Sequence, residues 1–116
     1  MEQKKIKDKS YLLEEDFDHN HLKNFKDWTK DWAEYCARED GIVLSMKHWE
    51  IIDFLRDYYA RFYYSPPQKI FFLELKKQLL IENPLEYLAE LFSVKNHTPP
   101  AWNAILYAGL PRPSSH

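Results

Sequence analysis

The sequence offers one cysteine and five histidines as candidate nucleophiles, bases or metal ligands. Cys36 lies one turn after Trp32 on the apolar side of an expected helix, near its C-terminal end, where the helix dipole favours the thiol over the thiolate. A reactive thiol would need a cationic neighbour or a helix N-terminus. We therefore predict a buried core cysteine. A single cysteine also excludes an intrachain disulfide and a zinc site built from cysteines.

The histidines do not form a metal site by their spacing. His19 and His21 make an isolated H-x-H pair, and the sequence has neither a second pair at ligand spacing nor an HExxH motif. We predict solvated loop histidines and no bound metal. His48 precedes Trp49 in the first turn of an expected helix, where packing or capping is the main interpretation and contact with a partner the alternative.

No catalytic grouping emerges from the other polar residues. Ser45 is explained as a helix cap and Ser65 as a cap before a proline. The acidic run from Glu14 to Asp18 is typical of a solvated loop rather than of a catalytic pair. We predict no catalytic residues and no cofactor, and the sequence leaves open whether the protein is an enzyme.

Composition limits the classes of protein that remain. A chain of 116 residues with 45% hydrophobic and 16% aromatic residues is one domain with a real core. The net charge of −2 argues against a nucleic-acid partner, so DNA binding through a helix-turn-helix is a minor alternative. The longest apolar runs, such as residues 70–73, are far too short to span a membrane. Without an apolar signal core after the charged N-terminus, we expect a cytoplasmic protein.

The periodicity of apolar residues and the capping and proline signals at helix ends predict about five helices within residues 24–108. The first runs from about Phe25 to Glu39, with Gly41 at the C-cap, and the second from a Ser45 cap to about Phe62. The third follows Ser65-Pro66-Pro67, the fourth follows a capping box at Asn83, and the fifth runs from Pro99-Pro100 to Gly109. The side chains that we expect to be largely buried are those of Trp28, Trp32, Trp49, Ile52, Leu55 and Leu88.

The sequence predicts extended structure, not helix, at the two ends of the chain. Residues 4–13 alternate weakly, with apolar points at Ile6, Tyr11 and Leu13, which favours a small β-hairpin within residues 1–18. Residues 109–116 contain Pro111 and Pro113, which predict an extended arm. We therefore predict an α+β fold in a single domain, 1–116: a mostly helical bundle with an N-terminal β-hairpin or meander and an extended C-terminal arm.

The order of these residues resembles the DsrC/TusE family of sulfur-relay proteins, whose members are also described as the gamma subunit of dissimilatory sulfite reductase. The resemblance covers nearly the whole chain. Its most specific parts are a block of the form HWE…FLR.YY…SP and an ending similar to AGLPKP. The segments that carry it are residues 24–28, 32–33, 39–42, 44–45, 48–50, 54–59, 65–66, 91–92 and 108–113.

The resemblance implies a small α+β fold and an arm that carries sulfur on a cysteine. The family's sulfur-carrying cysteine falls at His116, and the second cysteine found in some members falls at Ile105. Neither residue is a thiol, so the family's catalytic residues do not transfer to this chain. The partners implied are a sulfite reductase, or the relay complex and thiouridylase that thiolate the wobble uridine of certain tRNAs.

Two hypotheses follow from this departure. The first is a non-catalytic docking, adaptor or regulatory member that binds sulfur-relay or sulfite-reductase-like proteins through its arm. The second is a genuine sulfur carrier, in tRNA 2-thiouridine synthesis or sulfite reduction, that uses Cys36 or a thiol beyond a misplaced C-terminus. The sequence does not name the partner, the pathway or the oligomeric state. The candidate partner-binding residues are Leu110, Pro111, Arg112, Pro113 and His116.

Overall fold

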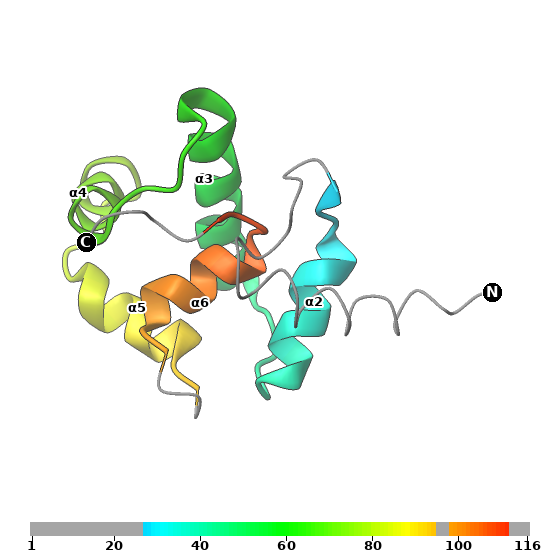
Figure 1. Ribbon diagram of the computed structural model, residues 1–116. Helices are drawn as coiled ribbons and strands as arrows, with labels where there is room; N and C mark the ends of the chain where they lie inside the picture. The colour runs from blue at the N-terminus through cyan, green and yellow to red at the C-terminus, as the bar shows by residue number, and fades with distance from the viewer. Residues whose placement is uncertain (1–26, 95–97, 112–116) are drawn as a thin grey trace.

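The computed structural model describes residues 27–94 and 98–111 and shows five α-helices in them (Figure 1). The helix α6 lies at the centre, with α5 on one side and α2 on the other, and it also packs against α3. The helix α4 packs against α5. The bounds of the helices are α2 Lys30–Glu39, α3 Met46–Phe62, α4 Gln68–Gln78, α5 Pro84–Phe92 and α6 Pro100–Tyr107.

The predicted α+β class is wrong, because the described residues form helices and no strand. The reason is that these helices bury their apolar faces against one another and so close a common core without a sheet. The predicted hairpin in residues 1–18 lies outside the described residues. The prediction of about five helices within residues 24–108 agrees with the helices found there.

Local capping explains where the helices begin. Thr29 Oγ1 accepts a hydrogen bond of 3.2 Å from the Trp32 amide, so α2 begins at Lys30 rather than near Phe25. Asn83 accepts a bond of 3.4 Å from the Glu86 amide and donates one of 3.0 Å to the Glu86 carboxylate. Asn83 therefore caps α5 as predicted, but the Glu86 carboxylate accepts from the Asn83 side chain, whereas in a capping box it accepts from the N-cap backbone amide.

Both glycines of the chain end a helix in the same way. Gly41 and Gly109 have φ values of 80° and 74°, in the left-handed region that favours glycine. The amide of the next residue then reaches back along the helix: Ile42 N bonds Ala37 O at 2.8 Å, and Leu110 N bonds Ile105 O at 3.1 Å. These are Schellman motifs, in which the residue after the glycine turns its side chain back toward the helix.

The core confirms the helical phase predicted from the apolar spacing. Trp32, Ile52, Leu55 and Leu88 are at most 2% exposed, while Trp28 and Trp49 are half-buried at the edge of the core. The helix α6 is buried along most of its length, which fits its position among the other helices. None of the helices in the described ranges is long and apolar enough to cross a membrane.

Substitution Gly41→Ala should lower the free energy of unfolding by about 1–2 kcal/mol, the cost of placing an L-residue in the left-handed region. A Cβ atom added at Gly41 would meet no atom within 4 Å beyond its two chain neighbours, so only the backbone contributes to this cost. Urea denaturation measures the effect. Gly41→Asn is the control, because asparagine tolerates this conformation and should cost less. Equal losses for the two variants would contradict the argument.

Candidate functional site

Two of the predicted partner-binding residues, Leu110 and Pro111, lie in the described part of the chain, just after α6. Leu110 is fully buried and Pro111 is half-buried. Leu110 is therefore part of the core of its own domain. Arg112, Pro113 and His116 lie outside the described residues. We call residues 106–111 the arm root, because the segment 112–116 continues directly from them.

Two tryptophans of the α2 region hold the arm root through their indole N–H groups. Trp32 Nε1 donates a hydrogen bond of 2.9 Å to the carbonyl of Leu106, and Trp28 Nε1 donates one of 2.8 Å to the carbonyl of Tyr107. The last carbonyl groups of a helix accept no hydrogen bond from an amide of the same helix, so they need donors from elsewhere. Trp28 satisfies this need at Tyr107, whereas the Leu106 carbonyl accepts from both Trp32 and the Gly109 amide, which lies 2.9 Å away. The two indoles fix the end of α6 against α2.

Arg56 of α3 provides the third contact. Its Nη1 atom donates a bond of 3.1 Å to the carbonyl of Ala108, and its guanidinium lies 4.2 Å from the centre of the Trp28 ring. A guanidinium at this distance gains a cation–π interaction. Burial lowers the pKa of Arg56 to about 10, which still leaves the group charged at neutral pH. A positive charge at the C-terminal end of α6 also complements the helix dipole.

Ser65 provides the fourth contact, at the far end of the arm root. Its hydroxyl donates a hydrogen bond to the carbonyl of Pro111, and the side chain is buried. The sequence suggested that Ser65 caps the following helix, but the N-cap of α4 is Pro67. Ser65 instead ties the connection between α3 and α4 to the last described residue of the chain.

Tyr107 adds a contact between α6 and the end of α2. Its hydroxyl donates a hydrogen bond of 2.6 Å to Oδ2 of Asp40. Burial, reinforced by this bond and by the charge of Asp40, raises the pKa of Tyr107, so its hydroxyl remains a donor. Burial also raises the pKa of Asp40, the Tyr107 bond partly lowers it, and the charge of Glu39 raises it further.

The remaining candidate residues have structural surroundings. Cys36 is 2% exposed, which confirms the predicted core cysteine. Ile105, at the family's second cysteine position, is 1% exposed and lies within α6. His19, His21, His97 and His116 lie outside the described residues. Within residues 27–94 and 98–111, no group of three histidine, cysteine or carboxylate side chains comes together to hold a metal ion.

His48 confirms the structural interpretation. It is buried, its Nδ1 atom accepts a bond of 2.9 Å from the Ser45 amide, and its Nε2 atom lies 2.7 Å from the carbonyl of Leu91. Since a carbonyl only accepts, Nε2 carries the proton in this contact and Nδ1 is the acceptor. His48 therefore caps the start of α3 and links it to α5, with its ring edge-on to Phe92 at 5.1 Å.

The site orients a segment of chain and supplies no nucleophile from the described residues that contact it. Sequence reasoning missed Trp28, Trp32, Arg56 and Ser65 as ligands of the arm root. One signal was present, because a buried indole N–H needs an acceptor. The same four residues lie in segments 24–28, 32–33, 54–59 and 65–66, which carry the family resemblance.

These features define a small helical domain whose side chains fix the starting point of a C-terminal segment. Comparison with known proteins identifies the family. The chain matches the family described as "DsrC like protein" over residues 5–115. It belongs to this sulfur-relay family, as the sequence resemblance predicted.

The relatives include proteins named "Sulfurtransferase TusE". The one from Buchnera aphidicola subsp. Schizaphis graminum is 33% identical over 95 residues, which cover 81% of this chain and 80% of the relative. The one from Escherichia coli is 34% identical over 94 residues, covering 80% of this chain and 83% of the relative.

Two solved structures share the fold. The NMR structure of DsrC from Allochromatium vinosum has a TM-score of 0.68 at 31% identity and covers 84% of both chains. The crystal structure of the oxidized gamma-subunit of the dissimilatory sulfite reductase (DsrC) from Archaeoglobus fulgidus has a TM-score of 0.64 at 31% identity. It covers 83% of this chain and 85% of that one.

Substitution Arg56→Ala should lower the free energy of unfolding by about 1.5–3 kcal/mol, because it leaves the Ala108 carbonyl without its charged donor. Urea denaturation measures this loss, and amide hydrogen exchange should accelerate at Leu110, where the arm root loosens. Arg61→Ala on the same helix is the matched control. Arg61 pairs with Asp57 at the surface, so its removal should cost at most about 1 kcal/mol. Similar losses for the two variants would contradict the proposed role of Arg56.

The raised pKa of Asp40 makes its contribution to stability depend on pH. The folded protein binds this proton more tightly than the unfolded chain, whose Asp40 has the ordinary pKa of 3.8. The contribution is therefore complete below that pH and is lost as the pH rises through the raised folded-state pKa. Asp40→Asn keeps an oxygen for Tyr107 and removes the charge. The difference in unfolding free energy, variant minus wild type, should grow between about pH 4 and pH 7 in urea denaturation. A constant difference would show that Asp40 titrates normally.

Proposed function

We propose that this protein is a docking or regulatory member of the sulfur-relay family, which binds its partner through residues 112–116 without carrying sulfur. One observation supports the proposal above all. Four carbonyls of the arm root accept hydrogen bonds from side chains of the domain, those of Trp28, Trp32, Arg56 and Ser65. The family's two cysteine positions, by contrast, are Ile105 and His116 in this chain.

The chemistry of the available side chains supports the same proposal. A persulfide needs a soft sulfur nucleophile, which neither isoleucine nor imidazole can replace. Cys36 is buried in α2 and accessible to a sulfur donor only if the core opens. The arm itself suits recognition, because Pro111 and Pro113 restrict its unbound conformations and so reduce the entropy lost on binding.

The partners that the family implies are sulfur-relay or sulfite-reductase-like proteins. Leu110 and Pro111 belong to the domain, so the segment that a partner would take begins at Arg112. A chain that ends after Pro111 should therefore fold normally and lose its partners in a pull-down from the native cell. Capture of the same partners by the shortened chain would show that the arm is not the interface.

Sulfur transfer provides the second test. Incubation of the full chain with a cysteine desulfurase and labelled cysteine should leave the arm without label, as detected by mass spectrometry. His116→Cys is the matched control, because it restores a thiol at the family's position and should become labelled. Label on Cys36 of the wild-type chain would favour the alternative, a genuine sulfur carrier. A cysteine found beyond position 116 in the native protein would favour it too.

A further inference from the structure

A groove of about 200 Å³ lies between α3 and α4, and we call it the α3–α4 groove. One wall comes from the C-terminal half of α3 and from Tyr64, which follows that helix. The other wall is one face of α4, made by Ile70, Glu74 and Gln78 at a spacing of four residues. None of the side chains that hold the arm root lines this groove. The groove is therefore a second, separate surface of the domain.

The α3 wall of the groove is a cluster of three aromatic rings. The centre of the Tyr58 ring lies 4.6 Å from that of Phe62 and 5.8 Å from that of Tyr64, which it meets edge to face. The Tyr58 hydroxyl also donates a hydrogen bond of 3.4 Å to the Tyr64 hydroxyl. Tyr58 is buried, whereas Phe62 and Tyr64 are 48% and 53% exposed. The wall thus presents aromatic surface that a ligand can cover.

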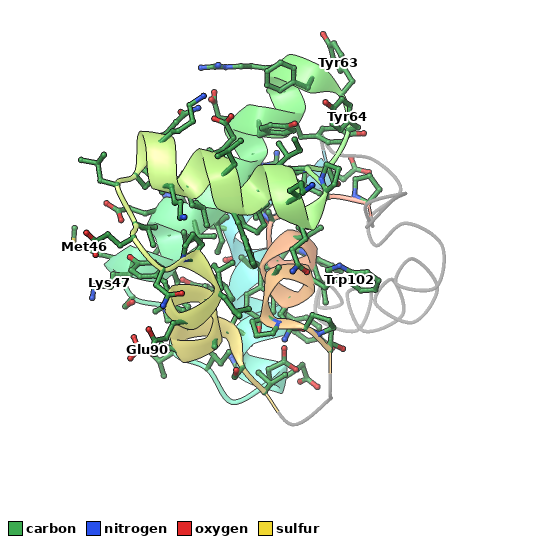
Figure 2. The ribbon with its side chains drawn as sticks, turned by 90° about the vertical axis from the view of Figure 1, so that its left-hand side faces the viewer. Met46, Lys47, Tyr63, Tyr64, Glu90 and Trp102 are labelled. Atoms are coloured by element: carbon green, nitrogen blue, oxygen red, sulfur yellow. The ribbon has the colours of Figure 1, made fainter. Side chains whose placement is uncertain are left out.

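The backbone is strained where it forms this wall. Tyr63, the C-cap of α3, has a φ of 63°, a conformation that is unfavourable for a residue other than glycine. The turn brings the ring of Tyr64 back against Tyr58, six residues earlier. Tyr63 itself is 79% exposed, so its side chain packs little against the domain (Figure 2). Strain of this kind is typical of sites that bind a ligand.

The charged side chains of the groove leave one carboxylate in excess. Asp57 is paired with Arg61 at 3.3 Å, so these two charges balance. Half-buried Glu74 accepts a bond of 2.6 Å from the neutral amide of Gln78, and within residues 27–94 and 98–111 no cation pairs with it. Burial and the contact with Tyr64 raise the pKa of Tyr58, and the charge of Glu74 raises it further. This carboxylate therefore acts on the aromatic wall across the groove.

A carboxylate beside aromatic rings favours a guanidinium group as the ligand. A guanidinium is planar, so it can stack on a ring and donate to a carboxylate at the same time, whereas an ammonium is a strongly hydrated point charge. An anion would be repelled by Glu74. The same helix already uses this combination at Arg56, which lies over the Trp28 ring and donates to the Ala108 carbonyl.

The surface beside the groove indicates that the guanidinium belongs to a protein chain. Tyr63 lies between two residues that line the groove and is 79% exposed, and Leu73, next to Glu74 in α4, is 49% exposed. A small free cation would leave both side chains in water. An arginine within a protein segment brings neighbouring residues that cover them, as apolar contacts around an arginine do at protein interfaces.

We propose that the α3–α4 groove is a docking site for a partner protein that inserts an arginine side chain. The guanidinium stacks on the exposed ring of Tyr64 and pairs with Glu74, and an apolar neighbour of the arginine covers Tyr63. This site lies on the body of the domain, so it goes beyond the proposed function, which concerns the arm. Either proposal can be wrong without the other.

A blocked arginine, N-acetyl-L-arginine methylamide, tests the chemistry of the site on the full chain. Titration should shift the NMR signals of the Tyr64 ring and the Glu74 amide. The matched control is the citrulline compound, which has the same shape without the charge. Arginine should bind roughly five- to thirtyfold more tightly than citrulline, the size of one ionic and one cation–π contact together. Equal binding of the two compounds would overturn the proposal.

Variants of the groove test the assignment of the contacts. Glu74→Gln keeps the shape of the side chain and should lower the affinity for the arginine compound at least threefold, toward that for citrulline. Tyr64→Leu should lower it two- to fivefold, because the stacking ring is lost. Glu90→Gln removes an exposed carboxylate of α5, at the end of the molecule away from Tyr64, and should change nothing (Figure 2). Arginine binding that survives Glu74→Gln would overturn the proposal.

Two measurements exclude the other occupants of the groove. Arg112→Gln should leave the affinity for the arginine compound unchanged. A severalfold gain would show that the chain's own arginine competes for the groove and would overturn the proposal. Sedimentation velocity should give the same mass for the wild-type chain and Glu74→Gln. A dimer that Glu74→Gln dissociates would show that a second copy is the occupant, and this result would overturn it too.

A pull-down from the native cell tests the partner itself. A protein captured by the wild-type chain and by Glu90→Gln should be lost with Glu74→Gln, and the arginine compound should release it where the citrulline compound does not. A chain that ends after Pro111 should still capture this protein, even though it loses partners that bind the arm. If Glu74→Gln loses no protein, the partner proposal is wrong, while the proposed function of the arm is untouched.

Discussion

The C-terminal end of α6 is buried, and its last carbonyl groups must find hydrogen-bond donors within the protein. A helix leaves its final carbonyls without partners inside the helix, and here Tyr107 and Ala108 are fully buried, while Leu106 has a local donor in the Gly109 amide. Indole and guanidinium groups supply the donors, from Trp32, Trp28 and Arg56. The placement of α2 and α3 depends on this requirement, because each helix must bring its donor to a particular carbonyl. Leaving one such acceptor unpaired costs about 1–3 kcal/mol.

The same end of α6 explains why a charged residue occurs among apolar ones in α3. Arg56 gives up part of its hydration, as its lowered pKa shows. Three gains offset this cost: the bond to the Ala108 carbonyl, the face of Trp28, and the negative end of the α6 dipole. Lysine has no planar group that could stack and bond at the same time, so it would not replace arginine here. Electrostatic interactions therefore fix the arm root as much as side-chain packing does.

Sequence reasoning succeeded where the cause is local and failed where it is not. The Asn83 cap, the two helix-ending glycines and the burial of Ile52 and Leu55 all follow from spacings of a few residues. The indole contacts join residues 79 and 74 positions apart, and no spacing rule reaches that far. Leu110 was assigned to the arm because prolines follow it. The Schellman motif at Gly109 accounts for its burial, since this motif brings the residue after the glycine back onto the helix.

The residues that fix the arm root in this chain are separate from positions 105 and 116, where the family resemblance places cysteines. The side chains that fix the arm root donate to backbone carbonyls, so they place no demand on which residues occupy positions 105 and 116. Ile105 of α6 is buried in the common core. An isoleucine buries more apolar surface than a cysteine, and each added methylene stabilises the fold by about 0.8 kcal/mol. The replacement at position 105 thus favours the fold. The contacts that fix the arm root in this chain therefore require no thiol at either position.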